Sequence, residues 1–365
     1  MAGTLVIAGA SGIVGRAALL HFAARPGWRV IGASRRRPDV DVGEHVSLDL
    51  TDRRTCERLL SAMSDVTHVV YAALFEKPGL FRGWQEQDQM RTNLDMLRNF
   101  MEPLEAAAPG LVHVSLLQGT KAYGAHVRPM RVPGKEREPR VAHENFYWLQ
   151  EDWLRARQAG KRWSFTIWRP PLVVGHAFGA PMNVLSALGI YAAIRKAQGR
   201  PFSWPGGVCG PIDAVDTRLL AQAFEWATDG MGGVNPAAAN ETFNVTNGDV
   251  LVFRNAWPAL ADAFGMEVGD DEPQRLAETL PAHAHVWDEV VVRHRLRAPD
   301  LQAFAGDSLL YADVFFNAGA TAPPPPTFLS PIKLRQAGFH ACMDSEDMLV
   351  SWVRELQRLR VLPPP

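Results

Sequence analysis

The feature that most constrains this chain is a glycine triplet between its first apolar run and its first helical stretch. In the sequence IAGASGIVGR, Gly9, Gly12 and Gly15 follow the spacing GxxGxxG directly after the β-branched run 4–8, and helix-like apolar spacing continues over 13–23. In a strand–turn–helix unit, such glycines allow a tight turn, close approach of a pyrophosphate and close packing of helix on strand. The pattern predicts a dinucleotide site at a helix N-terminus, where N–H donors and positive potential favour phosphate.

The rest of the first half alternates apolar runs of strand length with helical stretches. The expected strands cover 28–33, 45–48, 66–73, 111–117 and 165–169, and the expected helices include 55–63 and 87–107. This βαβ order predicts an α/β fold with a parallel sheet, covered by helices on both faces. We therefore expect a doubly wound Rossmann domain that binds its ligands at the carboxyl ends of the strands.

The end of the second expected strand indicates which dinucleotide is bound. Ser34-Arg35-Arg36 stands where NAD-dependent enzymes usually carry an acid for the ribose 2′-hydroxyl. Guanidinium groups make bidentate, charge-assisted contacts with phosphate, so NADPH (NADP+) is the expected cofactor. A solvated arginine run is the alternative. Asp49 is placed either to accept a hydrogen bond from the adenine amino group or to cap the next helix, and both roles stay open.

The alternation of expected strands and helices becomes less regular after Pro170-Pro171. We expect a NADP-binding Rossmann domain over 1–177, which also receives roughly 208–245, and a smaller, mostly helical substrate-binding part over 178–207 and 246–365. The proline run 323–326 is expected to be a stiff surface connector.

Composition limits the kinds of partner. Charged residues make up 21 % of the 365 residues and hydrophobic residues 47 %, with a formal net charge of −1. This balance predicts a globular chain and argues against a nucleic-acid partner. The stretch 127–140 mixes acids and prolines with its arginines, so we expect a solvated loop there. A small uncharged partner fits better.

Cysteine and histidine spacing gives no reason to expect a metal. Cys56, Cys209 and Cys342 have no paired spacing, which argues against a zinc site or a disulfide framework and suits the cytoplasm. His283 and His285 alternate as on a strand, but no third ligand stands at a metal-binding spacing nearby. No apolar run approaches the length of a membrane span, and no targeting segment is expected.

The stretch ENFYWLQEDW raises a question about catalysis. It reads like the catalytic helix of a short-chain dehydrogenase. Such a helix carries a lysine four residues after its tyrosine, but Glu151 occupies that position after Tyr147. None of the five tyrosines has a lysine at this spacing, and Tyr191 has only Arg195. Lys121 is the candidate that remains, because it lies just past the strand 111–117, where a doubly wound sheet presents catalytic groups. An exposed loop lysine is the alternative.

Several motifs together resemble a known family. GASGIVG, SRR, LLQGTKAYG, NFYWLQED, WSFTIWRPP and ETFNVTNGDV are similar to those of the progesterone 5β-reductase and iridoid synthase-like enzymes, an atypical extended branch of the short-chain dehydrogenases. The resemblance runs nearly from end to end. In that family the lysine comes from a strand-end motif and the tyrosine is the first of an NFYY motif. The resemblance therefore implies a split catalytic dyad of Lys121 and Tyr147.

The sequence departs from the family at several places. The glutamine-threonine pair before the lysine is shifted in register to Leu117-Gln118, Trp148 replaces the second tyrosine, and the stretch 202–216 differs throughout. Substrate contacts therefore cannot be transferred safely across that stretch. Plant members carry an N-terminal extension that is missing here, which favours a bacterial-type relative, and a monomer or homodimer is expected.

The resemblance implies NADPH-dependent 1,4-reduction of a small apolar enone, meaning an α,β-unsaturated ketone or aldehyde. Tyr147 would donate a hydrogen bond to the carbonyl oxygen, while Lys121 would stabilise the developing negative charge and lower the tyrosine pKa. The same dyad would serve carbonyl reduction or another reaction of extended short-chain dehydrogenases, with Ser115 or Thr120 as a third helper. A non-catalytic NADPH-binding regulator is a further alternative.

The expected site residues fall into cofactor contacts and a substrate pocket. The cofactor contacts are Gly9, Ser11, Gly12, Ile13, Gly15, Ser34, Arg35, Arg36, Asp49, Leu50, Ala72 and Pro170, the last beside a turn that resembles the family's cofactor-shaping turn. The substrate pocket is expected to be apolar and to include Trp148, Phe178, Met182 and Trp204, with Trp84 and Phe146 as further candidates. Large aromatic residues at such spacing are more often core, so only part of this set is expected to touch substrate.

Overall fold

The computed structural model describes residues 3–80, 82–229 and 232–365. The chain forms two compact units. Unit 1 contains 1–171, 217–246 and 327–341, and unit 2 contains 172–216, 247–326 and 342–365. The run 323–326, exposed except for the half-buried Pro324, ends at the point where the chain leaves unit 2.

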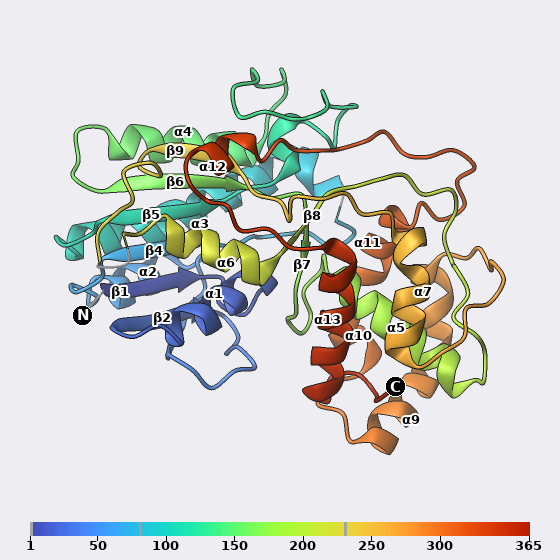
Figure 1. The fold of residues 1–365 in the computed structure, drawn as a ribbon. Coiled ribbons are helices and arrows are strands. Elements are labelled where there is room, and N and C mark those ends of the chain that lie inside the picture. Colours follow the sequence, from blue (N-terminus) through green and yellow to red (C-terminus); the bar gives the residue numbers. More distant parts are fainter. Residues whose placement is uncertain (1–2, 81, 230–231) are drawn as a thin grey trace. The chain divides into compact units, whose positions relative to one another are not determined.

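Unit 1 is built around a seven-stranded sheet (Figure 1). The strands are β1 (Gly3–Ala8), β2 (Trp28–Ser34), β3 (Glu44–Ser47), β4 (His68–Tyr71), β5 (His113–Leu117), β6 (Ser164–Arg169) and β9 (Glu241–Asn244). Their order is β3-β2-β1-β4-β5-β6-β9, and every neighbouring pair is parallel. The predicted doubly wound Rossmann fold is confirmed. All residues of β4 and β6 are buried, as expected for central strands covered on both faces.

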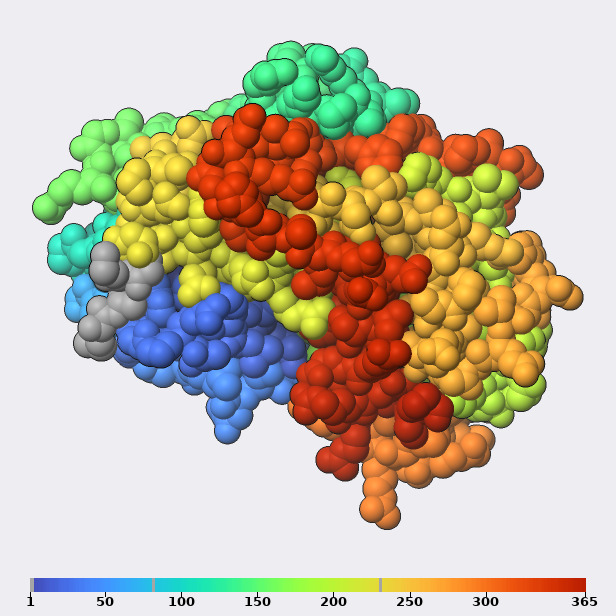
Figure 2. All heavy atoms as spheres, viewed as in Figure 1, coloured from blue at the N-terminus to red at the C-terminus, as the bar shows by residue number. Residues whose placement is uncertain are grey.

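Helices cover the two faces of this sheet. On one face, α1 (Ile13–Ala23) packs against α6 (Thr217–Trp226). The Glu225 carboxylate lies 2.7 Å from His21 Nε2 and accepts a hydrogen bond from Arg25 at 3.0 Å. In Figure 2 the yellow segment that contains α6 lies directly beside the blue N-terminal segment. The apolar cluster on the other face takes its side chains from α2 (Arg53–Leu60), α3 (Gln87–Ala107) and α4 (Phe146–Gln158).

Short elements complete unit 1. The 3-10 helices η1 (Arg82–Gln85) and η2 (Thr120–Tyr123) follow β4 and β5, and α12 (Ile332–Gln336) packs on β9. Asn244 at the end of β9 donates hydrogen bonds to the carbonyl oxygens of Gly134 and Ser330, so three distant segments of the chain meet there. Nothing in the sequence pattern signals that 327–341 belongs to this unit.

Unit 2 is mostly helical. A two-stranded parallel pair of β7 (Leu172–Val174) and β8 (Ala214–Asp216) accompanies its helices. These are α5 (Val184–Ala197), α7 (Phe253–Phe264), α8 (Leu276–Thr279), η3 (Leu280–His283), α9 (Ala284–His294), α10 (Leu301–Ala305), α11 (Ser308–Phe315) and α13 (Ser345–Arg358). Large aromatic residues fill its core, among them Phe202 stacked on Trp257 with ring centroids 4.1 Å apart.

One local expectation is wrong. The alternation of His283 and His285 suggested a strand, but η3 ends at His283 and α9 begins at Ala284. Alternation over three residues fits one turn of helix as well as a strand, which explains the error. Among the residues that the structure describes, no helix has both the length and the apolar composition needed to cross a membrane.

Candidate active site

The glycine triplet forms the turn between β1 and α1. Gly9 has φ +81°, a left-handed conformation that favours glycine, and a Cβ there would lie 2.8 Å from the Ala72 carbonyl oxygen. A Cβ on Gly15 would lie only 2.2 Å from the Gly9 carbonyl oxygen, so this glycine lets the helix approach the turn. Gly12 differs from both, because a Cβ there would meet only the Gly9 carbonyl oxygen, at 3.4 Å. The protein itself therefore leaves room for a small side chain at position 12.

The first turn of α1 has no side-chain cap. Gly12 is the N-cap of this helix. Ser11 and Ile13 beside it are half-buried. The first N–H groups of a helix lack intrahelical partners and carry a partial positive charge, so this turn offers the donors that a phosphate requires.

The arginines after β2 are exposed, as a phosphate-binding role requires. Ser34 is buried and donates to the Arg36 carbonyl oxygen at 2.6 Å, which fixes the backbone of the turn. The Arg35 guanidinium forms no hydrogen bond or ion pair with any residue that the structure describes, whereas Arg37 pairs with Asp41 at 3.1 Å. Arg35 is thus the arginine of this run whose charge is uncompensated within the described chain.

Asp49 is not the cap of the following helix. Its carboxylate accepts from the amide and the hydroxyl of Thr51, at 2.9 and 2.8 Å, while Asp52 is the N-cap of α2 and accepts from Thr55. The capping alternative for Asp49 is therefore wrong. Its carboxylate is exposed, and the next residue, Leu50, is buried. An adenine contact stays a prediction.

Lys121 lies in η2, directly past the end of β5. Its Nζ stands 3.7 Å from the centroid of the Trp84 ring, a cation–π contact. Burial lowers the pKa of Lys121 to about 8, and the nearby Glu76 carboxylate opposes part of that shift. Glu76 also accepts a hydrogen bond of 2.5 Å from Trp84 Nε1. The alternative of an exposed loop lysine does not hold, because Lys121 is half-buried and its cation lies over an aromatic face.

Tyr147 lies in the first turn of α4 and contacts the same tryptophan. The rings of Tyr147 and Trp84 meet edge to face with centroids 5.3 Å apart. A Cβ on Gly119 would lie 3.4 Å from the Tyr147 hydroxyl and 3.5 Å from the Pro170 carbonyl oxygen, so this hydroxyl faces the backbone at the ends of β5 and β6. Lys121 and Tyr147 therefore contact the same tryptophan ring.

Asn145 links the two residues through the backbone. It is the N-cap of α4, and its Oδ1 accepts a hydrogen bond from the Tyr147 amide at 2.9 Å. Its Nδ2 donates to the Lys121 carbonyl oxygen at 2.7 Å. One buried side chain thus contacts both candidate catalytic residues.

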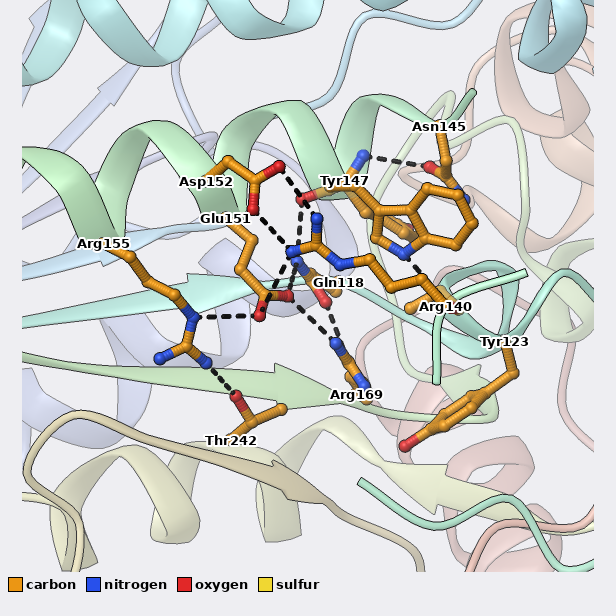
Figure 3. A network of polar contacts seen from close by, with 12 residues as sticks. Gln118, Tyr123, Arg140, Asn145, Tyr147, Glu151, Asp152, Arg155, Arg169 and Thr242 are labelled. Carbon is orange, nitrogen blue, oxygen red and sulfur yellow. Dashed lines mark hydrogen bonds and ion pairs between the residues drawn. The ribbon is translucent and has the colours of Figure 1, made fainter. Parts of the chain in front are cut away.

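Glu151, at the position where a lysine would complete a YxxxK pair, is a buried ion-pair partner. Figure 3 shows its carboxylate between three arginines from different segments. It accepts hydrogen bonds from Arg169 at 2.9 Å and Arg155 at 3.0 Å, and Arg140 lies 3.5 Å away. Burial alone would raise the pKa of Glu151, but Arg169 and Arg155 outweigh it and hold that pKa below its usual value.

Gln118 connects this network to the helix that carries Tyr147. Its Oε1 accepts from Arg169 at 2.9 Å, and its Nε2 donates to the Tyr147 carbonyl oxygen at 3.0 Å (Figure 3). Gln118 comes directly before the Gly119 turn. Gln118 therefore links the end of β5 to α4 just before the Gly119 turn, whereas Asn145 contacts Lys121 just after that turn.

The proposed third helpers differ in position. Ser115 is buried within β5, and its hydroxyl accepts from Trp168 Nε1 at 3.1 Å, so it lies in the sheet core. Thr120 begins η2 and is half-buried. Tyr191, the tyrosine followed by Arg195, is buried in the core of unit 2 and donates to the Ser203 carbonyl oxygen at 2.8 Å. It is a core residue.

The predicted pocket residues fall in both units. In unit 1, Trp148 is 7 % exposed and donates to the Ala122 carbonyl oxygen at 3.3 Å. In unit 2, Trp204 is 2 % exposed and packs against Trp257 within the core. Phe178 and Met182 are half-buried in unit 2. Their contacts with substrate stay predictions.

Sequence reasoning did not assign a role to several residues of this site. Asn145, Gln118 and Glu76 are polar residues whose partners lie far away in the sequence, so no local pattern reveals them. A helix-start signal exists for Asn145, because asparagine before a helical stretch is a common N-cap. The sequence suggests Trp84 only as a candidate for the pocket wall. Among the described residues, no cluster of metal-ligating side chains occurs.

Comparisons with known proteins place this geometry in a family. Residues 48–306 match the model of the PRISE-like Rossmann-fold domain. An (S)-8-oxocitronellyl enol synthase of Nepeta racemosa is 30 % identical, with 98 % of this chain and 91 % of that protein covered. A 3-oxo-Δ(4,5)-steroid 5β-reductase of Arabidopsis thaliana is also 30 % identical, over 98 % of this chain and 92 % of that protein.

Solved structures agree on the fold at lower sequence identity. The Bordetella bronchiseptica enzyme WbmG, in complex with NAD and UDP, has a TM-score of 0.64 and 17 % identity, covering 98 % of this chain and 96 % of that one. A UDP-glucose 4-epimerase from Bifidobacterium longum, in complex with NAD+ and UDP, has a TM-score of 0.66 and 14 % identity, covering 97 % and 98 %. The family match spans well over half of the chain, and this protein belongs to the PRISE-like Rossmann-fold family of progesterone 5β-reductase and iridoid synthase relatives.

Proposed function

We propose that this protein is an NADPH-dependent reductase of the activated C=C bond of small α,β-unsaturated ketones and aldehydes. The observation that carries the proposal is the arrangement around Trp84, whose ring contacts the Lys121 cation at 3.7 Å and the Tyr147 ring at 5.3 Å. This arrangement supplies a hydroxyl donor and a cation beside the strand ends. Two relatives with 30 % identity carry names of an enol synthase and a steroid 5β-reductase, which supports the same class of substrate.

The residues of unit 1 fit a nicotinamide dinucleotide. The uncapped first turn of α1 and the room at Gly12 suit a pyrophosphate, and the uncompensated Arg35 suits a 2′-phosphate. Ser34, Arg36, Asp49, Leu50, Ala72 and Pro170 complete the proposed set of contacts. When bound, NADPH supplies the hydride for the reaction.

Tyr147 and Lys121 would stabilise the charge that develops on the substrate. Addition of hydride to the β-carbon of an enone places negative charge on the carbonyl oxygen as an enolate. The Tyr147 hydroxyl donates a hydrogen bond to that oxygen, and the Lys121 ammonium favours the negative charge electrostatically. Because Lys121 is half-buried, its charge acts through a less polar medium than water, and its effect is larger there.

The neighbouring groups keep the dyad suited to this role. The pKa of Lys121, lowered to about 8 by burial, leaves the amine largely protonated at neutral pH. Trp84 supports the cation without a competing hydrogen bond, since Lys121 Nζ forms none with any residue of the described ranges. The ammonium therefore retains its donors for the tyrosine and the substrate.

The decisive experiment is turnover with product identification. Purified protein is incubated with NADPH and a small cyclic enone, cofactor oxidation is followed, and the product is compared with the saturated ketone and the allylic alcohol. We expect the saturated ketone, and we expect Tyr147→Phe to lower kcat by about 10²-fold or more, as for loss of one oxyanion donor.

The control is Tyr191→Phe, which removes a tyrosine hydroxyl in the core of unit 2. Its activity per folded molecule is expected to match that of the unmodified protein. An allylic alcohol as the main product would instead assign carbonyl reduction. Tight NADPH binding without any consumption across a broad enone and carbonyl panel would support the regulatory alternative.

A further inference from the structure

A split dyad has a geometric problem that a YxxxK helix does not have. In YxxxK, one helical turn fixes the spacing of tyrosine and lysine. Here Lys121 belongs to η2 and Tyr147 to α4, and the loop 124–144 separates the two elements. Helical geometry cannot set their relation, so contacts between the two elements must do so.

Asn145 supplies such a contact with both ends of its amide. Its Oδ1 accepts from the Tyr147 amide at 2.9 Å, and its Nδ2 donates to the Lys121 carbonyl oxygen at 2.7 Å. The side chain is 2 % exposed, so neither bond competes with bulk water. Most N-cap residues use only an acceptor, and asparagine is the one common cap that also offers an amide N–H donor.

Two neighbouring bonds place the same elements side by side. Trp148 Nε1 donates to the carbonyl oxygen of Ala122, the residue after Lys121, at 3.3 Å. Gln118 Nε2 donates to the Tyr147 carbonyl oxygen at 3.0 Å. Asn145 is nevertheless the only one of these three whose side chain contacts the backbone of both dyad residues.

We propose that Asn145 is a positioning residue, which sets the distance and orientation between Lys121 and Tyr147. The inference rests on the proposed function, because it assumes that these two residues act together on one substrate oxygen. Misplacement of a catalytic group by about 1 Å can lower a rate by about 10²-fold. Loss of the Asn145 amide should therefore lower kcat in a protein that still folds.

The chain offers a matched control in Asn235. Its Oδ1 accepts from the Ala237 amide at 3.0 Å, and its Nδ2 donates to the Trp226 carbonyl oxygen at 3.1 Å. This asparagine therefore makes the same two kinds of bond as Asn145. It lies in the loop between α6 and β9, at the edge of the sheet where the strands begin. A catalytic site lies at the other edge.

The test compares Asn145→Ser and Asn145→Asp with Asn235→Ser and Asn235→Asp. Serine and aspartate keep an acceptor for the helix N-terminus but lose the amide donor, and only aspartate adds charge. For both Asn145 variants we expect kcat for enone reduction to fall by about 10-fold or more, with KM and the NADPH dissociation constant changed by less than about 3-fold. For both Asn235 variants we expect kcat within about 2-fold of the unmodified protein.

Hydrogen exchange supplies a readout that does not depend on turnover. Backbone amides of the peptide 119–124 should exchange faster in the Asn145 variants and at the original rate in the Asn235 variants. An unchanged kcat together with unchanged exchange in 119–124 would overturn the positioning role. If the unmodified protein reduces no enone, the proposed function fails, and the exchange rates alone then decide whether Asn145 holds this turn.

Discussion

Arg169 donates a hydrogen bond of 2.9 Å to Glu151, the residue four positions after Tyr147. Both side chains are buried, at 7 % exposure each. A helix position that holds lysine in YxxxK enzymes therefore holds an anion here, and this anion fastens α4 to the end of β6. The proposed catalytic cation is Lys121 instead, and the position four residues after Tyr147 has a structural role.

Glu151→Gln should destabilise unit 1 strongly. The substitution leaves Arg169 buried without its anion, and breaking a buried pair in this way typically costs about 3–5 kcal/mol of unfolding free energy. Glu57→Gln is the control, since Glu57 pairs with Arg53 on an exposed face and its loss should cost less than about 0.5 kcal/mol. Urea denaturation measures both values. Equal, small effects would show that the buried pair contributes little.

Turnover should fall as the pH rises through about 8. Burial lowers the pKa of Lys121 to about 8, so the amine loses its positive charge in this range and no longer stabilises the substrate oxyanion. Lys121→Arg keeps its charge to far higher pH, so its profile should lack this alkaline limb, although its kcat will be lower because of altered geometry. Profiles of kcat against pH for both proteins test this. An identical limb in both would assign it to another group.

Gly12→Ala and Gly15→Ala should fail for different reasons. A Cβ at Gly12 meets only the Gly9 carbonyl oxygen at 3.4 Å, so the fold tolerates it, but the added methyl would stand in the proposed pyrophosphate site. A Cβ at Gly15 lies 2.2 Å from the same oxygen, so α1 must move. We expect Gly12→Ala to keep its melting temperature and lose NADPH affinity by about 10-fold or more, which is about 1.4 kcal/mol.

For Gly15→Ala we expect a lower melting temperature even without cofactor. Differential scanning fluorimetry with and without NADPH separates the two effects. Full NADPH affinity in Gly12→Ala would place the pyrophosphate elsewhere.

Arg35→Ala should lower the preference for NADPH over NADH. Its guanidinium has no partner within the described chain, which suits a charge-assisted contact to a 2′-phosphate. We expect the NADPH dissociation constant to rise by about 10-fold or more, at about 1.4 kcal/mol per factor of ten, while NADH binding changes little. Arg37→Ala removes an exposed arginine that already pairs with Asp41, and it should leave the preference intact. Equal losses for both cofactors would argue against a 2′-phosphate contact.

The protein should lose stability as the pH falls below about 6.5. His113 is buried between β4 and β6, and burial lowers its pKa to about 3. The Thr166 hydroxyl donates to the Ala238 carbonyl oxygen, so it accepts from His113 Nε2, and His113 Nδ1 must accept from Ser164. A proton on Nδ1 would require the Ser164 hydroxyl to turn and accept instead of donating.

The sign of the effect follows from proton binding. The unfolded chain takes up a proton on His113 near pH 6.5, whereas the folded chain does so only near pH 3, so unfolding is favoured between these values. At pH 5 this group should cost about 2 kcal/mol of unfolding free energy. Urea denaturation across pH 4–8 measures it, and His113→Asn should flatten the dependence. A slope unaltered by that substitution would show that other groups cause it.

The sequence predicts the elements of unit 1 well because their signals are local. The bounds 13–23 and 87–107 match α1 and α3, and the glycine triplet lies at the expected turn. Buried parallel strands read as continuous apolar runs, and helix periodicity separates them clearly. The proposed split dyad depends on the resemblance to a family, since Lys121 alone looks like a loop lysine.

The remaining parts depend on contacts between distant residues. Glu76 and Trp84 support Lys121, and Gln118 and Asn145 join β5 to α4, but no spacing rule connects these positions. Trp204 is predicted as a pocket residue because the size of its side chain suits a pocket wall as well as a core. Its 2 % exposure in the unit 2 core depends on tertiary packing alone.

Because unit 1 is built from segments far apart in the sequence, it remains incomplete during much of translation. When β6 leaves the ribosome, one edge of it has no partner, because β9 lies at Glu241–Asn244 and Asn244 in turn requires Ser330. An unpaired edge strand is a template for wrong pairing with other chains. The Rossmann sheet of a nascent chain is therefore incomplete, with β6 as an open edge, until most of the chain has been translated.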